Sequence, residues 1–186
     1  MKGILVTERY ARSLFELAVE RNELEQVYGD VLLIRKTCVE SRDFLLLLKS
    51  PIIQPDKKEK ILVRIFGDRL SRLTLGFLRL LVRKRREMYV AEIAGQFIEQ
   101  YQDYKNIIPV VVKTAAPLSE AVKKEILAVM KTYSDAAVEL EGSVDPELIG
   151  GFVLSWKDKQ YDASLSHQIE KLRRAIAKIN LYVKEF

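Results

Sequence analysis

The sequence predicts a mainly α-helical protein, with an N-terminal six-helix bundle followed by a small two-layer α/β domain. Through the first part of the chain, apolar residues recur every three or four positions, which is typical of helices that bury one face. From Ile107 onward, β-branched and alternating apolar runs appear, which are typical of strands. We therefore expect a helical domain over 1–105 and an α/β domain over 106–186.

Six segments of the first part carry the helical pattern. The third stops before Ser50-Pro51, because the residue before a proline disfavours helix. Asp56 is placed to cap the fourth. The fifth is the longest and contains the basic run Arg83-Lys84-Arg85-Arg86. The expected helices cover 7–21, 24–38, 41–48, 57–66, 70–90 and 92–105.

The second part is organised around residues 144–164. Asp145-Pro146 favours a turn, and Gly150-Gly151 permits a close backbone approach that a β-carbon would block. Alternating apolar residues follow at Phe152, Leu154 and Trp156. A β-hairpin is therefore expected, with its turn at Lys157-Asp158.

The remaining elements complete an α/β unit. Strands are expected over 107–112 and 138–141, with a helix from Ser119 to Tyr133 between them. Asp162 or Ser164 is placed to cap a final helix. Its heptad-like stripe is expected to cover the sheet, with a partner-binding role as the alternative. The stripe is Leu165, Ile169, Leu172, Ile176, Ile179 and Val183.

Composition excludes several classes of protein. The 186 residues are 48% hydrophobic, which is ample for a packed core, yet no apolar run approaches the ~20 residues of a membrane helix. The N-terminus lacks the apolar segment of a signal peptide, so we expect the protein to stay in the compartment where it is made. The single Cys38 excludes an internal disulfide. Up to Lys105 there are 20 basic and 15 acidic residues, against 11 and 11 afterwards, so the positive excess belongs to the first part.

No motif indicates catalysis, and we expect no catalytic, cofactor-binding or metal-binding residues. His167 is the only histidine, which favours a surface or capping role over a metal ligand. Asp145, Asp158 and Asp162 fit turn and cap positions. Gly150-Gly151 lacks the flanking residues of a phosphate-binding loop.

The basic run Arg83–Arg86 is the main feature that suggests a different function, the binding of nucleic acid. Such a run can bind phosphates, which would make the chain a nucleic-acid-binding helical protein. The surrounding stretch has few aromatic or glycine residues of the kind that stack on bases, and Glu87 ends the run. A solvated helix face is therefore the favoured interpretation.

Several segments together carry a family resemblance. They are Arg9-Tyr10-Ala11-Arg12-Ser13-Leu14-Phe15-Glu16-Leu17-Ala18, Pro51-Ile52-Ile53, Phe77-Leu78-Arg79-Leu80-Leu81, Thr114-Ala115-Ala116-Pro117-Leu118-Ser119, and Val144–Gly151 with Asp162, Ser164 and Leu172 downstream. In order and spacing, the chain resembles the delta subunit of bacterial ATP synthase, a relative of the mitochondrial oligomycin-sensitivity-conferring protein. It departs from the family at Lys157-Asp158, where Gly-Asp is common, and in the strongly basic run.

The resemblance implies a non-catalytic stator subunit of a proton-translocating F-type ATP synthase, without a cofactor. It implies a peripheral position on the cytoplasmic side of a bacterial membrane, and no nucleic acid is expected among the partners. The helical domain would bind the N-terminal helices of the head's alpha subunits, and the α/β domain would bind the b subunits of the stalk. The residues expected at the alpha subunits are Arg9, Tyr10, Arg12, Leu14, Ala18, Leu73, Phe77, Arg79 and Leu80. Those expected at the b subunits are Gly150, Gly151, Phe152, Asp162 and Leu172, together with the final helix.

Overall fold

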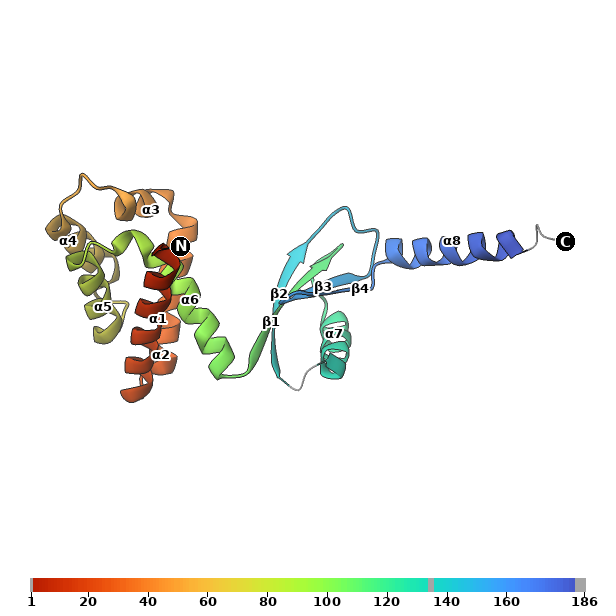
Figure 1. The fold of residues 1–186 in the computed structure, drawn as a ribbon, viewed down its shortest axis with the longest axis horizontal. Coiled ribbons are helices and arrows are strands. Elements are labelled where there is room, and N and C mark those ends of the chain that lie inside the picture. The colour runs from red at the N-terminus through yellow and green to blue at the C-terminus, as the bar shows by residue number, and fades with distance from the viewer. Residues whose placement is uncertain (1, 134–135, 183–186) are drawn as a thin grey trace. The chain divides into compact units, whose positions relative to one another are not determined.

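The computed structural model describes residues 2–133 and 136–182. Within these ranges the chain forms eight α-helices, one 3-10 helix and four β-strands (Figure 1). It divides into two compact units, Met1–Tyr104 and Lys105–Phe186. The first unit is helical and the second contains the sheet, so the predicted mainly α-helical fold with a small α/β part is confirmed.

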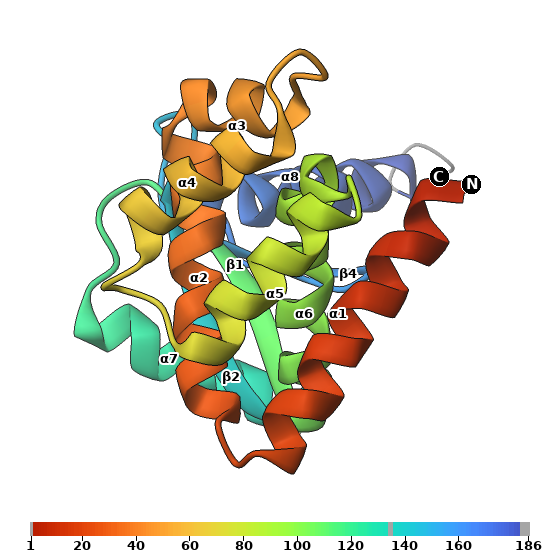
Figure 2. The same ribbon diagram turned by 90° about the vertical axis from the view of Figure 1, so that its left-hand side faces the viewer.

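The N-terminal unit is built around α6. Both α1 and α2 pack extensively along α6, and Figure 2 shows α5 in front of it. The buried side chains include Ala11, Val27, Leu81 and Phe97, which come from all four helices. The elements are α1 Lys2–Glu20, α2 Leu24–Glu40, α3 Arg42–Lys49, α4 Pro55–Phe66, α5 Arg72–Arg83, the 3-10 helix η1 Glu87–Tyr89, and α6 Val90–Tyr104.

Serine side chains cap two of these helices. The Ser41 hydroxyl accepts a hydrogen bond from the Phe44 amide, and the Ser71 hydroxyl accepts one from the Thr74 amide, each at 3.2 Å. The prediction that Asp56 caps α4 was wrong. That helix begins at Pro55, two residues before the predicted start, because proline suits the first helical position and lacks the amide hydrogen that would need a partner there.

The predicted long helix over 70–90 was also wrong, because α5 ends at Arg83. The Arg86 amide bonds to the Leu81 carbonyl at 2.8 Å, and the Arg85 amide bonds to the Val82 carbonyl at 3.0 Å. Arg85 has a φ of 55°. This is the Schellman helix ending, with arginine at the position where glycine is usual. The basic run therefore forms the last turn of α5 and the bend after it, rather than one helix face.

The C-terminal unit contains a four-stranded sheet in the order β2-β1-β3-β4. Strands β1 and β2 are parallel and α7 connects them, whereas β3 is antiparallel to β1 and β4 is antiparallel to β3. The expected hairpin is therefore present as β3 and β4. The elements are β1 Ile107–Thr114, α7 Glu120–Tyr133, β2 Ala137–Val144, β3 Phe152–Trp156, β4 Lys159–Asp162 and α8 Leu165–Tyr182.

Helix α7 covers one face of this sheet. The register pairs Val112 with Leu154, which places both side chains on the same face. Ile126 and Met130 of α7 are fully buried in the same apolar cluster. Trp156 also belongs to this cluster. Sheet and helix together make the two-layer core.

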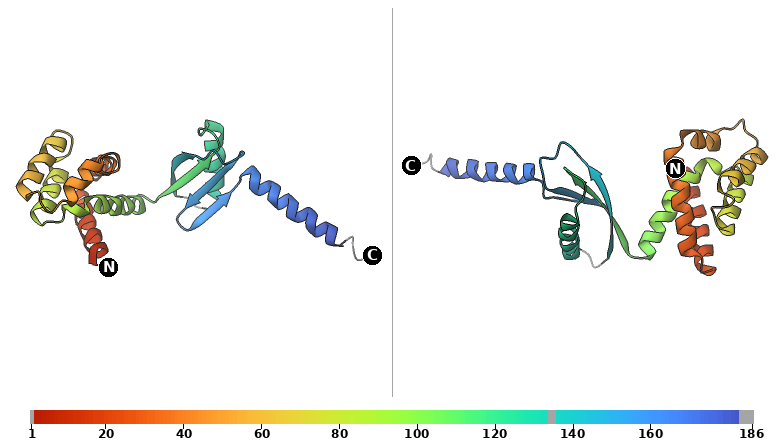
Figure 3. Two further views of the ribbon diagram at one scale, coloured as in Figure 1. Left: turned by 90° about the horizontal axis from the view of Figure 1, so that it is seen from above. Right: turned by 180° about the vertical axis from the view of Figure 1, so that it is seen from behind.

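Helix α8 does not cover the sheet, so the prediction that its apolar stripe belongs to the core was wrong. Leu165, Ile169, Leu172 and Ile176 are 44% to 63% exposed. Both views in Figure 3 show α8 leading away from the strands. The side chain of Ile179, and Val183 as a whole, lie outside the described residues.

The sheet itself explains this arrangement. Its apolar face is already filled by α7. The strand register places Lys113, Glu139 and Glu141 on the opposite face together with Val111 and Val153, so that face is mixed rather than continuously apolar.

Candidate partner-binding surfaces

The first candidate surface lies between α1 and α5. The rings of Tyr10 and Phe77 meet edge to face, with their centroids 6.3 Å apart. Both side chains are half-buried. On α5, Leu80 is 43% exposed. We call Tyr10, Phe77 and Leu80 the α1–α5 surface, because these three residues leave apolar atoms accessible on this pair of helices.

The other apolar residues predicted for this surface lie in the core. Leu14, Ala18 and Leu73 are all buried. Helical spacing cannot separate an apolar residue that faces the core from one that faces a partner, because both fall on the same broad stripe. These three residues therefore belong to the core beneath the α1–α5 surface.

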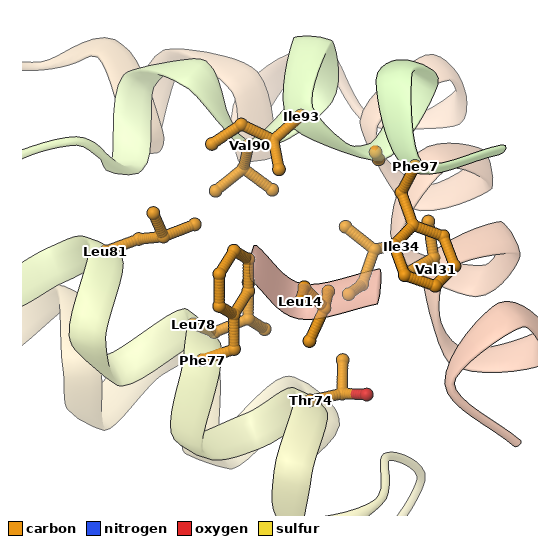
Figure 4. Close-up of a pocket in the computed structure, with 11 residues that line it drawn as sticks. Leu14, Val31, Ile34, Thr74, Phe77, Leu78, Leu81, Val90, Ile93 and Phe97 are labelled. Carbon is orange, nitrogen blue, oxygen red and sulfur yellow. The ribbon is translucent and has the colours of Figure 1, made fainter. Parts of the chain in front are cut away.

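A small cavity of about 10 Å³ lies beneath Phe77 (Figure 4). Its lining comes from α1, α2, α5 and α6, and all of it is apolar except Thr74. A cavity needs roughly 10–15 Å³ to hold even one water molecule. It is therefore a packing void of the core rather than a ligand site. Leu14, Val31, Ile34, Phe77, Leu78, Leu81, Val90, Ile93, Ala94 and Phe97 complete the lining.

The three predicted arginines occupy different environments. Arg9 is exposed on α1. Arg12 donates a hydrogen bond from Nε to Glu16 Oε1 at 2.8 Å, and this bond raises the pKa of the Arg12 guanidinium. Arg79 instead turns toward α4, where its Nε lies 3.5 Å from Glu59 Oε1. The structure therefore does not bring Arg79 together with the two arginines of α1.

Glu59 is a residue that the sequence reasoning missed. One of its carboxylate oxygens lies near Arg79, and the other lies 3.8 Å from Nε of Arg83. It lines an open cleft of about 460 Å³ with Asp56, Lys60, Val63 and Arg79. No local motif marks Glu59, because its partners belong to the next helix along the chain.

The predicted residues around the hairpin are largely structural. Gly151 has a φ of 79°, and a β-carbon there would lie 2.3 Å from the Ala163 carbonyl oxygen. A β-carbon on Gly150 would lie 2.7 Å from Cδ1 of Leu165. The glycine pair thus allows the turn before β3 to pass close to the start of α8. Phe152 is buried in the core.

Asp162 and Ser164 form the entry to α8. The Ser164 amide donates to Asp162 Oδ1 at 2.9 Å, and the Ser164 hydroxyl accepts from the His167 amide at 3.2 Å. Hydrogen bonding with the Ser164 side chain is the main cause that lowers the pKa of Asp162, and the bond from the Ser164 amide and the charge of His167 act in the same direction. Ser164 is therefore the cap, and Asp162 orients the residue that provides it.

Beyond this entry, α8 presents the second candidate surface. We call the exposed residues Leu165, Ile169, Leu172 and Ile176 the α8 stripe. Leu172 is the most exposed of the four, at 63%. It is also the one predicted binding residue of this unit whose side chain lies on the stripe.

Among residues 2–133 and 136–182, no helix is both long enough and apolar enough to cross a membrane. In the same part of the chain, no three His, Cys, Asp or Glu residues come together in a group that could hold a metal ion.

Comparison with known proteins identifies the family. Residues 6–176 match the family described as ATP synthase delta (OSCP) subunit. The ATP synthase subunit delta of Christiangramia forsetii is 36% identical over 185 residues, covering 100% of both chains. The one of Cytophaga hutchinsonii is 35% identical over 173 residues, covering 93% of this chain and 94% of that one.

A solved structure agrees with these sequence relatives. A chain of the Toxoplasma gondii mitochondrial ATP synthase hexamer superposes with a TM-score of 0.69 at 26% identity. The match covers 92% of this chain and 97% of that one. Since the family model, the bacterial relatives and the fold all agree over nearly the full length, the chain belongs to the ATP synthase delta (OSCP) subunit family.

Proposed function

We propose that this chain is a non-catalytic peripheral-stalk subunit of a bacterial F-type ATP synthase. In this role it joins the catalytic head to the b-subunit stalk and resists the torque of the rotor. The observation that carries the proposal is the match to ATP synthase delta subunits over 100% of the chain. The protein would sit peripherally on the cytoplasmic side of the membrane, held there by the complex.

The N-terminal unit would bind the N-terminal helices of the alpha subunits at the α1–α5 surface. Tyr10 and Phe77 meet there at 6.3 Å, and Leu80 leaves an accessible apolar side chain beside them. A partner helix with apolar anchors at helical spacing fits such a surface. Arg9 and Arg12 are exposed on α1 and supply positive charge at its edge.

The C-terminal unit would bind the b subunits through α8. Its exposed α8 stripe supports this role, because contiguous apolar side chains rarely stay open to water without a partner. Gly150, Gly151 and Asp162 would contribute indirectly, by fixing how α8 leaves the sheet.

The comparisons support the stalk role rather than the nucleic-acid alternative. The local structure agrees with this. Arg83 approaches Glu59, and the residues after it form the bend that ends α5. The run does not present a continuous cationic face of the kind that follows a phosphate backbone.

The two-site proposal can be tested by truncation. A chain that ends at Asn106 should bind the purified catalytic head but lose the b subunits in a pull-down from solubilised membranes. The truncated chain retains the whole Met1–Tyr104 unit, which has its own core. Loss of both partners would contradict two separate binding sites.

The α1–α5 surface needs a finer test. Leu80→Gln should weaken binding of a peptide with the alpha-subunit N-terminal sequence about tenfold, which corresponds to about 1.4 kcal/mol. Leu46→Gln is the matched control, because Leu46 is equally apolar and 56% exposed but lies on α3. Equal affinities for the two variants would argue against this surface. Arg9→Glu with Arg12→Glu should slow association at low salt.

A further inference from the structure

Gly76 lies inside α5, on the exposed side of the helix. Glycine is less favourable in a helix than any other residue except proline. The backbone does not require it here, because the φ of Gly76 is not in the left-handed region. A β-carbon at this position would point into open space, so packing within the chain does not require it either. No contact among the described residues therefore explains a glycine at this position.

Gly76 completes a hole on the surface of α5. Four residues at positions i, i+3, i+4 and i+7 surround one hole when helices pack with knobs into holes. On α5 these residues are Leu73, Gly76, Phe77 and Leu80, which we call the α5 hole. Leu73 is only 8% exposed and lies at the floor of the hole, whereas Leu80 is 43% exposed. Because Gly76 has no side chain, the α5 hole is wider and deeper than any other residue there would allow.

The α5 hole is continuous with the α1–α5 surface. Phe77 and Leu80 belong to both, and Tyr10 of α1 meets the ring of Phe77 at a centroid distance of 6.3 Å. Helical side chains lean toward the N-terminal end of their helix, which directs Leu80 toward the turn that contains Gly76. The side chains around the hole are all apolar. The hole therefore suits an apolar side chain, because a charged one would lose its hydration without gaining a partner.

We propose that Gly76 makes room for one large apolar side chain of the alpha-subunit N-terminal helix, which enters the α5 hole as a knob. This inference rests on the proposed function and adds the contact that sets how closely the two helices approach. A methyl group on residue 76 would occupy part of the space that the knob needs. The partner helix would then have to move outward and would lose contact with Phe77 and Leu80.

The experiment measures binding of the full chain to a peptide with the alpha-subunit N-terminal sequence of the same organism, by calorimetry. Gly76→Ala should weaken binding about fivefold and Gly76→Leu about a hundredfold, which is the range of overpacking costs expressed as affinities. Gly29→Ala is the matched control. Gly29 is also an exposed glycine inside a helix with open space at its β-carbon, but it belongs to α2. Its replacement should change the affinity by less than about twofold, because α2 contributes no residue to the α5 hole.

Thermal unfolding separates binding from folding. Gly76→Ala and Gly29→Ala should each raise the unfolding temperature of the N-terminal unit by about 4 °C, because alanine favours helix and its methyl group meets open space. Gly76→Ala would then fold more stably than the unmodified chain and yet bind less tightly. A lower unfolding temperature for Gly76→Ala would overturn the proposal, because it would mean that the space beside Gly76 is already filled within the chain.

The peptide identifies the knob. Alanine is placed at each large apolar position of the peptide in turn, and each peptide is measured against the unmodified chain and against Gly76→Ala. One position alone should show non-additive losses, because the change at Gly76 and the loss of the knob disrupt the same contact. Additive losses at every position would overturn the proposal.

The remaining outcomes separate the α5 hole from the proposed function. Unchanged affinity of Gly76→Leu would overturn the hole but leave binding to the head intact. Equal losses for Gly76→Ala and Gly76→Leu would also overturn it, because both residues stiffen a helix and only their volumes differ. A failure of the unmodified chain to bind the peptide would contradict the α1–α5 surface, and the hole with it. A dimer of the unmodified chain that Gly76→Leu dissociates would assign the hole to a second copy instead.

Discussion

The ammonium group of Lys58 lies 2.6 Å from Oε1 of Glu87, and both side chains are buried. The same ammonium donates a hydrogen bond to the carbonyl oxygen of Leu48 at 2.9 Å. One lysine of α4 thereby holds both η1 and the end of α3. Within the described part of the chain, Oε2 of Glu87 receives no hydrogen bond from the protein. The pair fixes the bend after α5, because Glu87 is the first residue of η1.

Removing one member of this pair should be costly. Lys58→Met leaves the Glu87 carboxylate buried without its counter-charge, and such losses destabilise proteins by roughly 3–5 kcal/mol. We expect a fall of this size in the free energy of unfolding of the N-terminal unit, measured by urea denaturation.

Two controls define the cause. The double variant Lys58→Met with Glu87→Met removes both charges and should lower the free energy of unfolding less than Lys58→Met alone. Lys36→Met breaks an exposed pair with Glu40 at 3.7 Å and should cost less than about 1 kcal/mol. A double variant as unstable as the sum of its single changes would show that the two charges do not interact.

Gly151→Ala should destabilise the C-terminal unit. The φ of 79° is unfavourable for alanine, and its methyl group would meet the Ala163 carbonyl oxygen at 2.3 Å. Backbone strain of this kind costs on the order of 1–3 kcal/mol. Thermal unfolding, followed by the fluorescence of the single Trp156 in the same unit, would report the loss.

Gly142→Ala is the matched control for this prediction. A β-carbon on Gly142 would have no atom within 4 Å, and its φ is not in the left-handed region. Alanine there should leave stability unchanged or raise it by about 0.4–1 kcal/mol, by restricting the unfolded chain. Similar losses for both glycines would mean that the close approach at Gly151 is not the cause.

These positions show what the sequence could and could not predict. The hairpin followed from local signals, because a glycine pair, alternating apolar residues and a polar turn leave few alternatives. The end of α5 did not, because arginine occupies the left-handed position that glycine normally marks. The bend there depends on Glu87 pairing with Lys58, 29 residues away in the chain.

The apolar stripes illustrate a second limit. Leu14 and Leu80 carry the same side chain on neighbouring helices, yet one is buried and the other is 43% exposed. On α8, the whole stripe is exposed because α7 already fills the apolar face of the sheet. Periodicity indicates that a face is apolar, but whether the core or a partner covers it depends on tertiary packing.

Cys38 should react slowly with thiol reagents. Burial, and to a lesser extent the charge of Glu92, raise the pKa of its thiol from 9.0 to about 11. Only the thiolate reacts readily, so labelling by a disulfide reagent at pH 8 should be far slower in the folded protein than in urea. Equal rates in the two states would contradict the buried position.

The raised pKa of Cys38 also predicts a dependence on alkaline pH. The unfolded thiol releases its proton near pH 9.0, whereas the folded one holds it to about pH 11. The folded state therefore binds more protons in this interval, and its stability falls as the pH rises through it. Comparison with Cys38→Ala isolates this contribution from that of other groups. The difference in the free energy of unfolding between the two proteins should become smaller as the pH rises.

Asp162 should contribute stability that is lost at acidic pH. Its pKa is lowered in the folded state, mainly by hydrogen bonding with the Ser164 side chain. A lowered pKa means that the stabilisation is present above the unfolded value of about 3.9 and is lost as the pH falls through the folded value.

Asp162→Asn keeps an acceptor for the Ser164 amide but removes the charge. It should therefore lower the unfolding temperature at pH 7 and have a smaller effect at pH 3. Asp158→Asn, in the exposed hairpin turn, is the control and should change the unfolding temperature little at pH 7. A deficit for Asp162→Asn that is equally large at both pH values would mean that the charge near the start of α8 does not stabilise this entry.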